Sequence, residues 1–196
     1  MVQLSTNLRT VLVLGDPRLR QVAEPVSATL LAAAVTQELI DSLIDTMRAA
    51  GGAGLAATQI GVPLRICVIE VDHNPRYPYK PPIPLTVLVN PELTRLTDEE
   101  FENNEGCLSV PGLRGNVARC TEIGVRALDR TGQVLEFQVR GLSAGTFQHE
   151  VDHLDGRLFL DNLTDPATLA TWDNFERFQK ASYLDRVHEL IARYGS

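Results

Sequence analysis

The sequence has few cysteines and no long apolar run. Its 196 residues include Cys67, Cys107 and Cys120, an odd number without a closely spaced pair. This pattern excludes a disulfide framework and fits a reducing compartment. Residues 11–15 form an apolar run too short for the core of a signal peptide, and no stretch approaches a membrane span. We therefore expect a soluble, cytoplasmic protein without a membrane segment.

Positive charge is also scarce. Lys and Arg total 18 against 25 Asp and Glu, which gives a net charge of -7 at pH 7 and a pI near 5.1. A surface that binds nucleic acid needs clustered Lys and Arg, and the sequence has no such cluster. We expect no direct, sequence-specific contact with nucleic acid.

Two of the four histidines, His149 and His153, stand four residues apart. In a helix they project from one face, one turn apart, and both imidazoles reach a single divalent metal. Glu150 is placed to take a proton from water that such a metal has acidified. Two solvent-facing histidines are the alternative, but apolar residues surround the pair and Gly156 is a suitable helix stop. The pattern therefore predicts a hydrolytic metal site.

The third metal ligand identifies the class of enzyme, because catalytic sites usually hold the metal with three protein ligands. A metzincin-type protease would have histidine at the position of Phe159. A thermolysin-like enzyme would use a downstream glutamate, and Glu176 and Glu189 remain open. Cys107 offers a thiolate that suits zinc or ferrous iron. A structural metal-binding module is a further alternative, although it would need four protein ligands.

Three motifs in this order resemble the signatures of the peptide deformylases, and the resemblance extends from about residue 10 to about residue 163. One departure is Thr58, where the first motif more often has proline; we expect it to loosen the approach to Gln59. The matching segments are Gly-Ala-Gly-Leu-Ala-Ala-Thr-Gln at 52–59, Glu-Gly-Cys-Leu-Ser at 105–109, Gln-His-Glu-Val-Asp-His-Leu-Asp-Gly at 148–156, and Gly-Asp-Pro-Arg-Leu-Arg at 15–20.

The resemblance implies hydrolysis of the N-formyl group from the N-terminal formylmethionine of new proteins, with release of formate. It implies that Cys107, His149 and His153 hold one divalent metal ion. Ferrous iron is the native metal of the family, and zinc, nickel or cobalt also suit this ligand set. Glu150 is then the base that activates water. A metallopeptidase is the alternative within enzymes.

Further roles are also carried over from the family. The oxyanion of the reaction is stabilised by the side-chain amide of Gln59 and the backbone N–H of Leu108. Glu105, paired with Arg119, is expected to orient a metal ligand. The remaining expectations concern the peptide substrate. The backbone around Ala53, Gly54 and Gly106 is expected to align the peptide, and Arg114 to contact it. Leu108 and Leu142 are expected to line the methionine pocket, and Gly145 and Thr146 to set its size.

The order of predicted elements indicates a single α+β domain over residues 1–196, with short strands around a central metal-binding helix. Apolar residues recur every four positions from Leu31 through Val35 to Met47, which predicts one amphipathic helix over 28–50. The metal-binding helix is expected over 143–155, with Ser143 as its N-cap. The predicted strands are 64–71, 86–90 (ended by Asn90-Pro91), 117–129 and 133–141, and the last two form a hairpin. Residues 73–84, with five prolines, are an expected surface loop, and His73 there is interpreted as solvated.

A C-terminal helical segment is expected over 166–196, starting after Asp165-Pro166. Its apolar stripe includes Leu184, Val187 and Leu190. We interpret this stripe as packing on the body of the domain. The alternatives are a homodimer contact or transient docking to a larger assembly such as the ribosome.

Overall fold

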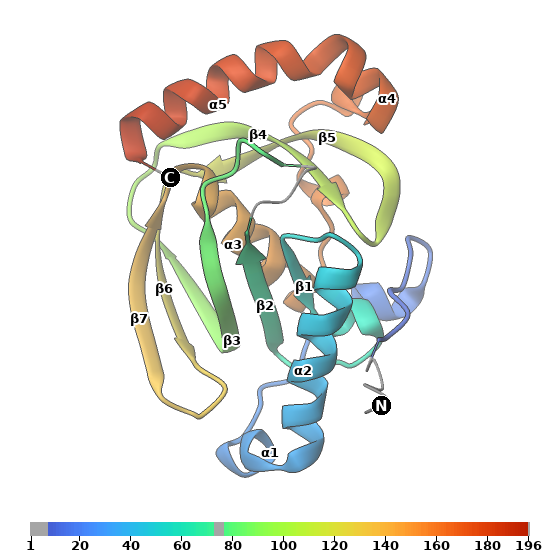
Figure 1. The fold of residues 1–196 in the computed structure, drawn as a ribbon, viewed down its shortest axis with the longest axis vertical. Helices are drawn as coiled ribbons and strands as arrows, with labels where there is room; N and C mark the ends of the chain where they lie inside the picture. The colour runs from blue at the N-terminus through green and yellow to red at the C-terminus, as the bar shows by residue number, and fades with distance from the viewer. Residues whose placement is uncertain (1–7, 73–76, 196) are drawn as a thin grey trace, which may run out of the picture.

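The computed structural model describes residues 8–72 and 77–195, so His73 lies outside the described residues. Two antiparallel sheets and a central helix make up the α+β fold, which confirms the expected class (Figure 1). The first sheet has the order β1-β2-β3-β6-β7 and the second the order β4-β5-β8. The strands are β1 (Gly54–Ala56), β2 (Ile66–Val71), β3 (Ile83–Arg95), β4 (Glu100–Cys107), β5 (Val110–Cys120), β6 (Glu122–Leu128), β7 (Val134–Arg140) and β8 (Ala170–Thr171).

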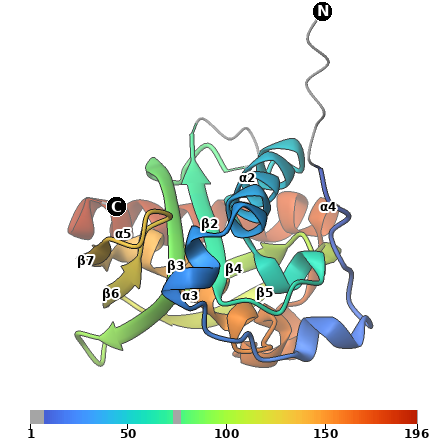
Figure 2. The ribbon, with the colours of Figure 1, turned by 90° about the horizontal axis from the view of Figure 1, so that it is seen from below.

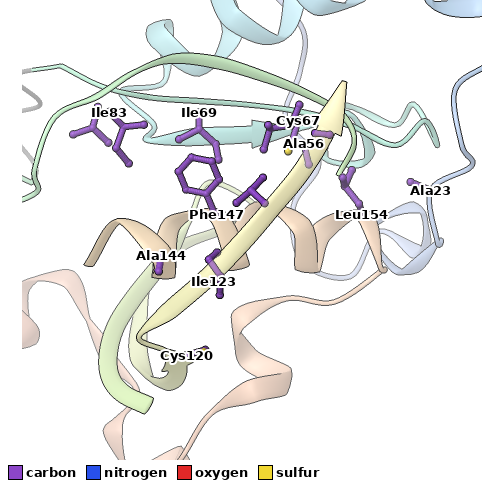
Figure 3. Close-up of a cluster of buried hydrophobic side chains, with 14 residues drawn as sticks. Ala23, Ala56, Cys67, Ile69, Ile83, Cys120, Ile123, Ala144, Phe147 and Leu154 are labelled. Atoms are coloured by element: carbon purple, nitrogen blue, oxygen red, sulfur yellow. The ribbon is translucent and has the colours of Figure 1, made fainter. Parts of the chain in front are cut away.

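Helix α3 (Gly141–Leu154) packs against strands of both sheets and carries the two metal-ligating histidines. Phe147 anchors it, because its ring is 3% exposed and meets Phe137 of β7 edge to face, with centroids 5.8 Å apart. Figure 3 shows Phe147 of α3 beside Ile69 in a buried apolar cluster that also includes Ala144. Burial of one such aromatic side chain contributes about 1.5–3 kcal/mol, so this packing holds the helix against the first sheet.

The helix predicted over 28–50 is two helices, α1 (Ala28–Ala32) and α2 (Ala34–Ala49). Ala33 between them is extended, with φ −71° and ψ 139°. The side chain of Gln37 donates to the carbonyl of Leu31 at 2.8 Å, which a continuous helix would use itself, and also to the distant carbonyl of Arg130 at 3.0 Å. The break turns Val35 outward, where it is 66% exposed, so the predicted stripe is wrong at that position.

Strand β3 continues past Asn90-Pro91, so the expectation that it ends there is wrong. Asn90 adopts φ 52°, and the pairing of β3 with β6 shifts register between Val89 and Glu92. Asparagine tolerates this left-handed conformation better than most residues. Its side chain accepts from the N–H of Val26 at 2.8 Å and donates to the carbonyl of Val26 at 2.9 Å. The irregularity therefore ties the N-terminal segment to the sheet.

The predicted hairpin is confirmed as β6 and β7, which pair from Glu122–Arg140 to Leu128–Val134. The strand predicted over 117–129, however, is divided at Thr121 between the two sheets. The N–H of Thr121 donates to the carbonyl of Glu99, and its carbonyl accepts from Gly141 at 2.8 Å. Both backbone groups of Thr121 are thus hydrogen-bonded to other segments at the point where the chain passes from one sheet to the other.

The start of α3 differs from the prediction. The helix begins at Gly141, after Arg140, so Ser143 is inside its first turn and is not the N-cap. The bond from Gly141 to Thr121 satisfies one N–H group at this terminus. At the other end Gly156 has φ +72°, which confirms it as the helix stop.

The C-terminal segment is less regular than predicted. Asp165 caps the helix start as expected, but the turn Pro166–Thr168 has only three residues and leads into β8. The main helix begins at Trp172 and comprises α4 (Trp172–Asn174), a π-helical turn (Phe175–Gln179) and α5 (Lys180–Tyr194). Figures 1 and 2 show α5 lying over the second sheet. Val187 is buried in a cluster with Leu142 of α3, so the stripe packs on the body. In the part of the chain that the structure describes, no helix is long and apolar enough to cross a membrane.

Candidate active site

Cys107, His149 and His153 meet at one point, and their ligand atoms all lie within 4.8 Å of one another. The Sγ of Cys107 is 3.3 Å from Nε2 of His153, and the two imidazole rings have centroids 4.9 Å apart. A tetrahedral centre with one sulfur and two nitrogen ligands needs ligand separations of about 3.4–3.6 Å. The three side chains therefore fit one divalent metal ion after only a small adjustment.

The tight connection between β4 and β5 presents Cys107. Cys107 pairs with Val110, so only Leu108 and Ser109 form the turn. The N–H of Ser109 donates to Sγ at 3.3 Å, and Nε2 of Gln59 lies 3.5 Å from it. Burial raises the pKa of the Cys107 thiol, but the charges and hydrogen bonds of the two histidines outweigh it and hold this pKa well below its usual value. The site thus favours the thiolate, which is the form that binds a metal.

Glu105 contacts the first histidine. Its Oε2 lies 2.8 Å from Nδ1 of His149, which leaves Nε2 of that ring for the metal. Arg119 makes two hydrogen bonds to this carboxylate, at 2.8 and 2.9 Å, and a third to Asp152 at 2.6 Å. The predicted pair of Glu105 and Arg119 is confirmed, and both residues are buried. Asp152, on the same helix as His149, is a further partner of Arg119 that the sequence did not indicate.

Glu150 lies beside the ligands with a free oxygen. The residue is 4% exposed, and among the described residues its Oε2 has no hydrogen-bond partner. Burial raises the pKa of this carboxyl group above its usual value, although the nearby histidines partly oppose the shift. Gly54 makes room for it, because a Cβ at Gly54 would lie 2.4 Å from Cδ of Glu150. A buried carboxylate without a partner is unusual unless a ligand or water completes it.

Gln59 directs its amide nitrogen toward the site. Its Oε1 accepts from the N–H of Ala56 at 2.8 Å, so Nε2 faces Ser109 at 3.1 Å and Cys107. Thr58, the departure from the motif, is 2% exposed, and its hydroxyl donates to the carbonyl of His153 at 3.0 Å. This hydroxyl links the first motif to the end of the metal-binding helix.

A cavity of about 440 Å³ opens onto the ligands. Of the residues predicted to bind substrate, Ala53, Gly54, Gly106, Leu108 and Arg114 line it, as do Gly145 and Thr146. Leu142 does not; it is 1% exposed and packs against the C-terminal helix at Phe175 and Tyr183. The reason is that the helix begins at Gly141, which turns Leu142 away from the cavity.

Tyr77, Lys80 and Trp172 also line the cavity, and no sequence motif indicated them. They come from the loop before β3 and from α4, two segments far apart in the chain. Nζ of Lys80 donates to Oγ1 of Thr146 at 3.0 Å, and burial lowers the pKa of Lys80 to about 8. These residues form the end of the cavity that the motifs do not cover.

Arg114 is enclosed by aromatic rings. Its guanidinium carbon lies 4.5 Å from the ring centroid of Trp172 and 4.6 Å from that of Phe175. Its Nε donates to Oδ1 of Asn104 at 2.7 Å, and the whole side chain is 1% exposed. Contacts of this kind contribute up to about 2 kcal/mol when they are desolvated. Arg114 therefore joins the C-terminal helix to the wall of the cavity.

The alternative third ligands lie elsewhere. Phe159, at the metzincin position, is fully buried in an apolar cluster with Val117 and offers no ligand atom. Glu176 is paired with Lys180 at the surface, and Glu189 is exposed on α5. Among the described residues, the group of side chains able to hold a metal is the one completed by Cys107.

An antiparallel α+β scaffold that aims a thiol and a His-Glu-x-x-His helix into an open cavity is characteristic of a metal-dependent hydrolase. Comparison with known proteins narrows this class. A family model described as polypeptide deformylase matches residues 8–168, and the chain belongs to that family. The chain is accordingly a metal-dependent hydrolase with peptide deformylase activity.

Individual relatives agree with this assignment. Peptide deformylase 1 of Prochlorococcus marinus (strain MIT 9313) is 47% identical over 166 residues, which cover 82% of this chain and 83% of the relative. The Met-Ala-Ser-bound crystal structure of the class I type b enzyme from Acinetobacter baumannii has a TM-score of 0.77 and 37% identity, covering 80% of this chain and 98% of that one. The Synechococcus elongatus enzyme in complex with actinonin has a TM-score of 0.72 and 29% identity, covering 95% of this chain and 86% of that one.

Proposed function

We propose that the chain, as a single catalytic domain over residues 1–196, removes the formyl group from the formylmethionyl ends of nascent polypeptides, with Glu150 as the base. The observation that carries this proposal is the unpartnered, buried carboxylate oxygen of Glu150 next to the cluster of Cys107, His149 and His153. A divalent metal held by Cys107, His149 and His153 would lower the pKa of bound water and polarise the formyl oxygen. The products are formate and a free α-amine.

Glu150 moves the proton. It accepts a proton from the attacking water and delivers it to the nitrogen as the carbon–nitrogen bond breaks, so one carboxyl group acts as base and then as acid. Its raised pKa suits both steps, because burial makes the protonated form easier to reach. Such a group contributes about 10²- to 10⁴-fold to the rate.

Gln59 and Leu108 stabilise the negative charge that develops on the formyl oxygen. The bond from Ala56 to Oε1 of Gln59 presets its amide nitrogen toward the reaction centre. The N–H of Leu108 lies in the same turn as Cys107. Each donor of this kind lowers the barrier by about 2.7–4 kcal/mol in other hydrolases.

The peptide lies along the cavity. The backbone around Ala53, Gly54 and Gly106 lines the cavity and aligns the chain, and Arg114 supports the far wall. Gly145 and Thr146 set the size of the methionine pocket. Because Leu142 packs under the C-terminal helix, Leu108 supplies the apolar contact to the methionine side chain.

Ferrous iron is the metal that we propose for the native enzyme, with zinc, nickel or cobalt as substitutes. One thiolate and two imidazoles suit all four ions. We further propose a cytoplasmic enzyme that works as a monomer or homodimer. We propose that any association with the ribosome is transient, since the apolar stripe of the C-terminal helix is used in packing on the body.

The test is formate release from a short formyl-methionyl peptide, compared with release from Glu150→Gln. The amide nearly preserves shape but cannot act as a base, so the variant should keep its metal and lose turnover. Metal content and formate are measured on the same samples. A wild-type rate in this variant would rule out Glu150 as the base. Cleavage of internal peptide bonds with formyl groups untouched would instead favour a metallopeptidase.

A further inference from the structure

A chain of buried hydrogen bonds runs from the C-terminal helix to the metal ligand His149. The hydroxyl of Tyr183 on α5 donates to Oδ1 of Asn103 at 2.9 Å. Nδ2 of Asn103 donates to Oε1 of Glu105 at 3.0 Å, and Oε2 of Glu105 lies 2.8 Å from Nδ1 of His149. Tyr183, Asn103 and Glu105 are 2%, 4% and 5% exposed, so water does not compete with these bonds.

The chemistry of the three groups permits only one orientation of the Asn103 amide. Both oxygens of the Glu105 carboxylate accept hydrogen bonds from Arg119, at 2.8 and 2.9 Å, in a buried ion pair. An ionised carboxylate only accepts hydrogen bonds, so Asn103 must turn its NH₂ group toward Glu105. Its carbonyl then faces Tyr183, whose hydroxyl donates. Without that donor, the carbonyl of Asn103 would lose its partner in a dry site, at a cost to this orientation.

The packing around Asn103 leaves it little freedom. Gly145 of α3 lies one helical turn before His149, and a Cβ there would be 3.0 Å from Nδ2 of Asn103. A glycine inside a helix costs about 0.5–1 kcal/mol relative to alanine, and here it makes room for the amide. The ring of Tyr183 is fixed in turn by Phe175 and Tyr79, with centroids 5.8 and 5.6 Å away.

We propose that Tyr183 is a positioning residue for the metal centre: through Asn103 it fixes the Glu105 carboxylate that orients His149. This inference rests on the proposed metal site. Tyr183 lies beyond residues 8–168, so the C-terminal helix contributes to the site from outside the segment that the family model matches. Partners of this kind typically change metal affinity or activity by about 10- to 100-fold, and Tyr183 acts from one residue further away.

The test compares Tyr183→Phe with wild type in two measurements that need no turnover. One is the rate at which cobalt(II)-loaded protein loses its metal to a chelator; the other is the visible spectrum of bound cobalt(II), which reports ligand geometry. We expect Tyr183→Phe to lose cobalt about three- to tenfold faster and to shift the spectrum. Tyr194→Phe is the matched control, because Tyr194 lies on the same helix and its hydroxyl bonds the exposed Glu99, outside the chain of bonds. It should match wild type in both measurements.

A double-mutant cycle with Asn103→Ala separates positioning from packing. If Tyr183 acts through Asn103, then Tyr183→Phe has no further effect on cobalt loss in the Asn103→Ala background. An equal effect in both backgrounds would overturn the proposal, as would wild-type cobalt loss and spectrum in Tyr183→Phe. Should Tyr183→Phe fold poorly, Gly145→Ala provides the second variant, because it displaces the same amide while favouring the helix; unchanged cobalt loss and spectrum there would also overturn the proposal. Failure of wild type to release formate would reject the proposed function separately, because cobalt loss is measured without substrate.

Discussion

Gly54→Ala is the sharpest test of how the first motif supports the base. A Cβ at this position would lie 2.4 Å from both Cδ and Oε1 of Glu150, whereas ordinary contact begins at 3.4 Å. The carboxyl group must therefore move by about 1 Å, and at 4% exposure it has little space to do so. A misplacement of about 1 Å can reduce a rate about 100-fold, or about 2.7 kcal/mol of barrier.

The assay is formate release by Gly54→Ala at saturating peptide, with metal content and thermal unfolding measured on the same samples. Gly124→Ala is the control, because a Cβ at Gly124 in β6 would meet its nearest neighbour at 3.7 Å, an ordinary contact. We expect Gly54→Ala to keep its metal, to lose about 1–3 kcal/mol of stability through overpacking and to lose most of its turnover. The control should keep both stability and turnover.

The effect must also depend on Glu150. Adding Gly54→Ala to Glu150→Gln should lower the residual rate by less than about twofold, since neighbouring changes that act through one group are not additive. A full 100-fold loss in that background would mean that Gly54 matters for another reason, such as backbone contact with the peptide. A rate for Gly54→Ala within about threefold of wild type would refute the steric argument outright.

Three further predictions follow from the charges and ligands of the site. Arg119→Met removes the cation that two carboxylates share and should lower the free energy of unfolding by about 3–5 kcal/mol, a fall in Tm on the order of 10 °C. Arg95→Met, at an exposed ion pair, should change Tm little. Similar falls in Tm for the two variants, measured by calorimetry, would contradict this prediction. The pKa of Lys80 is lowered from 10.5 to about 8 in the folded protein, so between pH 8 and 10.5 the unfolded chain binds more protons than the folded one. The stability of wild type should therefore rise relative to that of Lys80→Met as pH increases through this range. Urea unfolding at pH 7 and 10 measures this, and a stability difference that does not change with pH would contradict it. Iron-loaded protein should lose activity in air while nickel- or cobalt-loaded protein persists, with Cys107 followed by mass spectrometry; equal lifetimes for aerobic and anaerobic iron samples would favour zinc.

The metal ligands and the base were predictable because their geometry is local. The spacing of His149 and His153 needs only a helix, and Cys107 needs only the family motif around it. Tyr183 and Lys80 were not predictable, because their roles depend on which buried partner tertiary packing brings to them. The apolar stripe of α5 indicated that this helix is packed, but such a pattern does not show that a tyrosine hydroxyl meets Asn103.

The errors in secondary structure have the same origin. Ala33 has high helix propensity, yet the helix breaks there, where the side chain of Gln37 donates to the carbonyl of Leu31 before the break and to the carbonyl of Arg130 between β6 and β7. The strand through Asn90 continues because its side chain bonds Val26, 64 residues away. In each case a long-range hydrogen bond outweighs a local preference of a few tenths of a kcal/mol to about 1 kcal/mol.

The position of Tyr183 late in the chain has a consequence for the order in which the site is completed during synthesis. Tyr183 is made 34 residues after His149. At about 5–20 residues per second, the ribosome needs roughly 2–7 s to cover that distance. Until α5 docks, the amide of Asn103 lacks its donor, although Glu105, Arg119 and His149 are already part of the chain. We therefore expect a metal ion that binds before docking to meet a more loosely held His149 than one that binds after it.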